Sequence, residues 1–159
     1  MTVARLAVDR ATNAPVVVLR DAVGDRGVAI WIGAAEAGAI ALALQGERAP
    51  RPLTVDLLAA TITALGAEVE SVAISAVRSG TYLAEVRVIA ADGGRHVIDA
   101  RPSDAIALAL LAGAVLMARD GLLTTEHGGI PSPPEPLSAE ELRQHISRLG
   151  PEDFGRFLT

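Results

Sequence analysis

The hexapeptide Ala-Ile-Ala-Leu-Ala-Leu occurs twice in this chain, at residues 39–44 and again at residues 105–110. Each copy lies in a stretch that predicts a helix with apolar side chains around nearly its whole circumference. A helix of this kind must be covered on several faces, by a protein core or by a subunit interface. The second copy begins the longest apolar run, 105–118, which is shorter than the roughly 20 residues of a membrane-spanning helix. We therefore expect a cytoplasmic protein with no membrane contact that forms homo-oligomers, most simply two-fold dimers.

The spacing of apolar and turn-forming residues predicts alternating groups of strands and helices. Thr54 and Ser103 are the expected N-caps of two of the helices, and glycines end all three. Both copies of the hexapeptide follow a short strand, which fits either a duplicated strand–helix unit or coincidence in an Ala-rich chain. The expected strands are 2–9, 15–20, 28–32, 68–77, 82–91, 95–99 and 114–118, and the expected helices are 34–45, 54–65 and 103–112.

Composition changes near residue 126 and predicts three regions. Residues 1–125 form the expected core domain, for which a chain of 159 residues is long enough. Residues 126–137 contain four prolines and predict a stiff, extended linker. Residues 138–159 predict a helical tail, because Ser138 and Glu141 have the spacing of a capping box.

The composition excludes several kinds of chemistry. The chain has no cysteine, and its 14 basic residues are all arginine. Disulfides, thiolate nucleophiles, cysteine-bound zinc and a Schiff-base or P-loop lysine are therefore excluded. The net charge of −5 argues against an extended nucleic-acid footprint, but it leaves room for a small cluster of arginines. We expect His96, His127 and His145 to be structural or solvent-exposed.

Two segments share a layout in which an Arg-Pro pair precedes a helix with an aspartate in its first turn. Arg51 and Asp56 have these positions in one segment, and Arg101 and Asp104 in the other. Glu36 lies in the first turn of a third expected helix. The structural interpretation is that such carboxylates complement the helix dipole, by about 0.3–1 kcal/mol each, while arginines brace the turns.

The functional interpretation requires these groups to meet in one place. Carboxylate oxygens are the ligands that Mg²⁺ or Mn²⁺ prefers, and arginine suits bidentate contact with phosphate. Together they would form a site that cleaves phosphodiester bonds with the help of a metal ion. The candidate metal ligands are Glu36, Asp56, Asp99 and Asp104; the candidate catalytic residues are Asp56, Asp104, Arg51 and Arg101; the candidate substrate-binding residues are Arg51, Arg101, Thr54 and Ser103.

Four segments in order along the chain carry a family resemblance. They are Pro-Val-Val-Val-Leu at 15–19, Ile-Trp-Ile-Gly at 30–33 with Glu-Ala at 36–37, Pro-Arg-Pro-Leu-Thr at 50–54 with Asp-Leu-Leu at 56–58, and Asp-Ala-Arg-Pro-Ser-Asp-Ala-Ile-Ala-Leu-Ala at 99–109. Over about residues 3–120 the sequence resembles the bifunctional nuclease domain family. The resemblance implies an α+β fold with a mixed or antiparallel sheet, often dimeric. It also implies metal-assisted cleavage of both DNA and RNA, so that nucleic acid is the expected partner.

One position departs from the family pattern. Val55 stands where the family usually has a histidine before the aspartate. A valine can neither transfer a proton nor bind a metal ion. The sequence therefore leaves two hypotheses: a metal-dependent nuclease of low sequence specificity, or a non-catalytic regulatory or protein-binding module that retains the fold.

Overall fold

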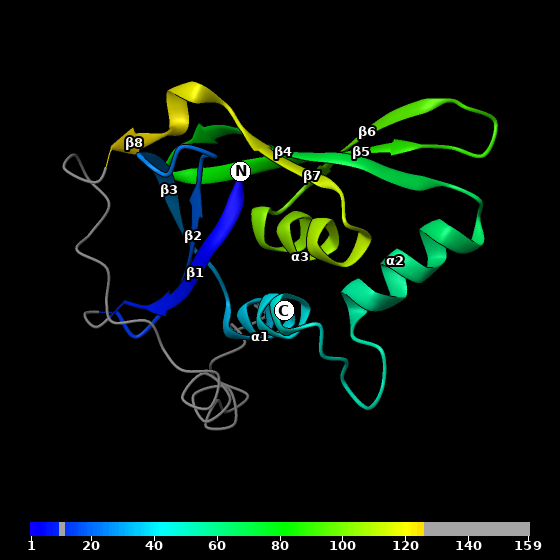
Figure 1. Ribbon diagram of the computed structural model, residues 1–159, viewed down its shortest axis with the longest axis horizontal. Helices are drawn as coiled ribbons and strands as arrows, with labels where there is room; N and C mark the ends of the chain where they lie inside the picture. The colour runs from blue at the N-terminus through cyan, green and yellow to red at the C-terminus, as the bar shows by residue number, and fades with distance from the viewer. Residues whose placement is uncertain (10–11, 126–159) are drawn as a thin grey trace, which may run out of the picture.

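The Val- and Leu-rich runs near the N-terminus pair as an antiparallel sheet. The computed structural model describes residues 1–9 and 12–125, and in it this sheet has the order β1-β2-β3-β8 (Figure 1). Turn-forming residues separate the first three strands, and a two-residue strand near residue 125 closes the far edge beside β3. The strands are β1 (Thr2–Val8), β2 (Pro15–Arg20), β3 (Arg26–Trp31) and β8 (Thr124–Thr125).

The second sheet is mixed and has the order β6-β5-β4-β7. Its first three strands form two antiparallel hairpins, whose turns contain Gly80 and Gly93 with positive φ. The chain then crosses over through a helix, so that the last strand pairs parallel with β4. Two sheets, one antiparallel and one mixed, confirm the expected α+β class. The strands are β4 (Glu68–Arg78), β5 (Thr81–Ile89), β6 (Arg95–Ala100) and β7 (Val115–Ala118).

The three α-helices of the described residues are α1 (Ala34–Gln45), α2 (Thr54–Ala64) and α3 (Pro102–Ala112). A short 3-10 turn, η1 (Asp120–Leu122), follows β7. The predicted N-caps are wrong by one or two positions: Leu53 and Arg101 occupy them with extended backbone and no side-chain bond. In α3 the cause is Pro102, whose fixed φ and missing N–H suit the first helical position, so that the helix begins before Ser103.

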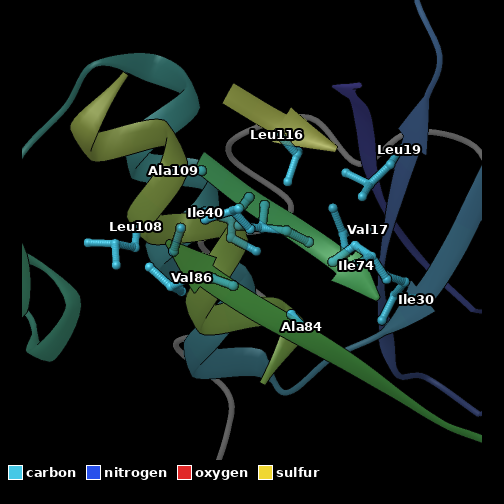
Figure 2. Close-up of a cluster of buried hydrophobic side chains, with 14 of the residues drawn as sticks. Val17, Leu19, Ile30, Ile40, Ile74, Ala84, Val86, Leu108, Ala109 and Leu116 are labelled. Carbon is cyan, nitrogen blue, oxygen red and sulfur yellow. The ribbon is translucent and has the colours of Figure 1, made fainter. Parts of the chain in front are cut away.

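The core lies where α3 packs against the mixed sheet and the first sheet closes one end (Figure 2). Ile106 and Ile74 are fully buried between α3 and β4, and Val17 and Leu19 reach the same cluster from β2. On its other side α3 contacts α1 and α2. α3 is therefore the central helix of the fold, with protein on nearly every face.

The two copies of the repeated hexapeptide have different surroundings. In α3 the copy is buried from Ala105 to Ala109, whereas in α1 only Ala37 and Ile40 are buried. The copy begins in the first turn of α3 but in the second turn of α1. The preceding strands, β6 and β3, also belong to different sheets. The core of a single chain thus covers α3, and no subunit interface is needed for that purpose.

The predicted linker at 126–137 and the predicted helical tail at 138–159 lie outside the described residues. Within the described residues, no helix is both long enough and apolar enough to cross a membrane.

Candidate functional site

Helix α2 leaves a hollow on each of its sides. The central hollow, of about 790 Å³, lies among α1, α2, α3, β5 and β6. The outer hollow, of about 1210 Å³, lies between α2, the ends of β4 and β5, and the C-terminal end of α3. The predicted site residues divide between these two hollows. Glu36, Thr54, Asp99, Arg101, Ser103 and Asp104 line the central hollow, and Asp56 lines the outer one.

Arg101 joins the N-terminal ends of α1 and α3 in the central hollow. Its Nε and Nη2 donate to both carboxylate oxygens of Asp104, at 2.8 and 3.2 Å. Nη2 also lies 3.0 Å from Oε1 of Glu36 on α1. Two distant segments of the sequence thus place their acidic side chains on one guanidinium, as the functional interpretation required for Glu36, Arg101 and Asp104.

The environment of Arg101 favours its charged form. Its hydrogen bonds to Asp104 raise the pKa of the guanidinium above its usual value, as does the negative charge of Asp104 and of Glu36. The side chain is nevertheless 68% exposed. Nη1 has no partner among the described residues, so two N–H groups beside the hollow are available to an external acceptor.

Glu36 is held by local backbone geometry as well as by charge. Its carboxylate folds back over Gly33, so that a Cβ at this position would collide with Oε2 of Glu36. Gly33 is the N-cap residue of α1, where its backbone is extended. The Ile-Trp-Ile-Gly segment therefore ends in a residue without a side chain where the carboxylate approaches the backbone.

Asp99 borders the central hollow but belongs to a different surface. The strand register places Asp99 opposite Glu85, whereas Val86 is opposite Ile98. Because side chains alternate along strands, Asp99 and Glu85 share the face of the sheet that points away from the helices. The register therefore separates the Asp99 carboxylate from the group around Arg101.

Asp56 stabilises the start of its own helix. Its Oδ2 accepts a hydrogen bond from the backbone N–H of Leu53 at 2.9 Å, and its Oδ1 accepts one from Nη1 of Arg48 at 3.2 Å. Arg51 is exposed, makes no ion pair among the described residues, and lines neither hollow. The two Arg-Pro segments therefore share a sequence layout without sharing a site.

Sequence reasoning missed two residues of these hollows. Tyr82 lines the central hollow from β5, and its alternation with Ala84 and Val86 on the helix-facing side was the available signal. Arg48, the partner of Asp56, lies in a loop whose path the sequence does not indicate. Val55 also lines the central hollow, half-buried against the core. The position that departs from the family pattern therefore faces the same hollow as Arg101.

The arrangement of the carboxylates bears on metal binding. Among the described residues, no group of three or more histidine, aspartate or glutamate side chains is placed to hold a metal ion. Arg101 contacts both Glu36 and Asp104, and its positive charge takes the place that a cation would have between them. As packed, the carboxylates of Glu36 and Asp104 lie against this guanidinium rather than in a group of three or more possible metal ligands.

His96, the histidine on β6, is exposed, whereas His127 and His145 lie outside the described residues.

Comparison with the sequences of known proteins agrees with the family resemblance of the motifs. A model of the bifunctional nuclease domain matches residues 17–129. Two uncharacterised proteins from two strains of Mycobacterium tuberculosis are each 37% identical to this chain over 156 residues. Each alignment covers 92% of this chain and 92% of the relative.

Proposed function

Because this chain belongs to the bifunctional nuclease domain family, we propose that it hydrolyses phosphodiester bonds of DNA and RNA at the central hollow, with low sequence specificity. One observation carries the choice of site: Arg101 borders this hollow with Nη1 unpaired among the described residues, while carboxylates from α1 and α3 fix the rest of its guanidinium. A guanidinium held in place before the substrate arrives loses little further freedom on binding phosphate.

The residues of the hollow have distinct roles in this proposal. Nη1 of Arg101 donates to a non-bridging oxygen of the phosphodiester and stabilises the charge that develops there. Asp104, whose side chain is 43% exposed, accepts the proton of the water that attacks phosphorus. General-base help of this kind contributes about 10²–10⁴ in rate. As the new P–O bond forms, the P–O bond to the leaving sugar oxygen breaks, and that oxygen takes a proton from solvent. Glu36 is a positioning residue that holds Arg101, and Thr54 and Ser103 lie in the wall beside the substrate.

Low sequence specificity follows from the contacts that the hollow offers. The proposed interaction is with the phosphate, which carries no sequence information, and the rest of the lining is largely apolar. The net charge of −5 argues against an extended basic surface along which a duplex would be read. The substrate is therefore a short stretch of backbone, common to DNA and RNA.

No step of this reaction is assigned to Mg²⁺ or Mn²⁺, because no group of three or more possible ligands is placed to hold a metal ion among the described residues. The requirement for a divalent ion stays a prediction from the family resemblance, and comparing activity with Mg²⁺, with Mn²⁺ and with chelator tests it.

Val55 favours a second candidate function, a non-catalytic regulatory or protein-binding module. It lines the central hollow at the position where the family usually has histidine, so the hollow lacks an imidazole there. Among the described residues the charges around Arg101 also neutralise one another in part. Such a hollow would bind a phosphate-containing ligand without cleaving it.

The test is release of acid-soluble nucleotides from single-stranded and duplex substrates, with Mg²⁺, with Mn²⁺ and with chelator. Asp104→Asn should lower the rate at least about a hundredfold, because an amide cannot accept the proton. Asp56→Asn is the matched control in the outer hollow and should leave the rate unchanged. Equal activity of wild type and Asp104→Asn would contradict the proposal. Inactive wild type with activity gained in Val55→His would favour the non-catalytic module.

A further inference from the structure

We propose that β6 pairs with the β6 of a second copy of this chain and extends the mixed sheet across a two-fold axis. β6 is the end strand of that sheet among the described residues. Its outer side therefore presents backbone N–H and C=O groups that no described strand uses. Such an edge is a template for pairing with another chain unless it is protected. The proposal does not depend on the proposed function.

β6 carries the charged residues Arg95 and Asp99 but lacks the other usual protections of an exposed edge. Val97 is 63% exposed and Ile98 is 50% exposed, and consecutive residues of a strand point to opposite faces of the sheet. Apolar surface is thus open on both faces of the edge. No proline lies in the strand, and no bulge interrupts its pairing with β5 between Arg95 and Ala100.

The charges of β6 make the strand complementary to itself. Arg95 and Asp99 lie symmetrically about Val97 on the same face. In an antiparallel pair centred on Val97, Arg95 lies opposite the Asp99 of the second copy, and the reverse contact repeats at the other end. A register centred on residue 96 or 98 forms neither contact. Charge therefore selects one register, in which the two Val97 side chains also meet.

The environment of these two charges inside one chain supports the same pairing. Asp99 lies directly opposite Glu85 on β5, and like charges in that position repel. Within the described part of the chain, neither carboxylate is in an ion pair. Arg95 contacts Glu70 at 3.4 Å, but its side chain is 74% exposed, and such pairs are weak and screened by salt. A second copy would place an arginine beside the acidic pair.

The pairing also fixes where the two central hollows lie. In the selected register, odd-numbered residues lie opposite odd-numbered residues, so side chains paired across the interface point to the same face of the sheet. The two-fold axis is therefore perpendicular to the sheet. The helices of both copies then cover the same face of one continuous sheet. β6 contributes Ile98 and Ala100 to the lining of the central hollow, so the hollows lie on either side of the axis.

Charge reversal tests this interface. The wild-type chain should have twice its 16.4 kDa mass in sedimentation equilibrium at micromolar concentration. Arg95→Glu and Asp99→Arg should each weaken the dimer by at least about a hundredfold, because each reversal acts at both ends of the interface. The combined Arg95→Asp and Asp99→Arg variant restores opposite charges in the same register and should recover the dimer.

Arg87→Glu is the control, because it makes the same charge change on the same face but one strand inward, on β5. It should keep the dimeric mass, and circular dichroism should show every variant folded. A monomeric wild-type protein would overturn the proposal. So would a dimer that survives both single reversals, or a combined variant that remains monomeric.

Discussion

Helices α2 and α3 begin with nearly the same sequence layout, yet they have opposite places in the molecule. Each has an Arg-Pro pair at or just before its start and carries an aspartate in its first turn. α3 buries seven residues at the centre of the fold, whereas α2 buries none and exposes Leu57 and Leu58. The likeness of two motifs therefore predicts a similar helix start, and the surrounding chain decides what that start can do.

The same contrast applies to the two aspartates. Asp104 shares Arg101 with Glu36 from another helix, and its carboxylate is 43% exposed beside the central hollow. Asp56 is 12% exposed and satisfies a backbone N–H three residues earlier in the chain. A carboxylate used by its own helix contributes mainly to stability, and one that remains accessible between helices is available for chemistry.

The largest expected difference between the two helices is in stability. Ile106 of α3 is fully buried, so Ile106→Ala should lower the free energy of unfolding by about 2–5 kcal/mol. Leu57 of α2 is 61% exposed, and Leu57→Ala should change it by no more than about 0.5 kcal/mol. Urea unfolding followed by circular dichroism measures both values. Similar losses in the two variants would contradict the placement of α3 at the core.

A smaller effect separates the two aspartates. Asp56→Ala removes the acceptor of the Leu53 N–H and should cost about 1 kcal/mol of unfolding free energy, as the loss of a cap does. Asp104→Ala removes an exposed ion pair and should cost about 0.5 kcal/mol or less. The rate of phosphodiester cleavage should show the reverse order: it should fall in Asp104→Ala and stay unchanged in Asp56→Ala. If the same variant lost more of both the unfolding free energy and the cleavage rate, the assignment of Asp56 to stability and Asp104 to chemistry would be wrong.

Local sequence determined most of the elements but not their neighbours. Helix α1 ends where Gly46 predicts, with φ of 65°, and strands β2 and β6 lie within a residue of their expected bounds. The order of the strands and the parallel pairing of β7 with β4 depend on contacts between distant segments, which periodicity does not report. Contacts between distant segments also explain why α3 buries more of its residues than α1, although both helices contain the same hexapeptide.

The candidate site was predictable in part for the same reason. Glu36, Arg101 and Asp104 do meet, because α1 and α3 pack side by side at their N-terminal ends. Asp56 lies on the other side of α2, and the register of β6 turns Asp99 to the far face of the sheet. Residue types alone do not specify which face of an element points toward a hollow.

We propose that phosphate binds at Arg101 in the central hollow and not at Arg48 in the outer hollow. The two side chains are matched controls, being 68% and 72% exposed and each paired with an aspartate. Fluorescence anisotropy with a labelled single-stranded oligonucleotide, at one fixed low salt concentration, measures the affinity of Arg101→Gln and Arg48→Gln. Arg101→Gln should weaken binding by about tenfold or more, the loss of a charge-assisted hydrogen bond, and Arg48→Gln should leave it unchanged. Equal losses in the two variants, or a loss confined to Arg48→Gln, would contradict the account.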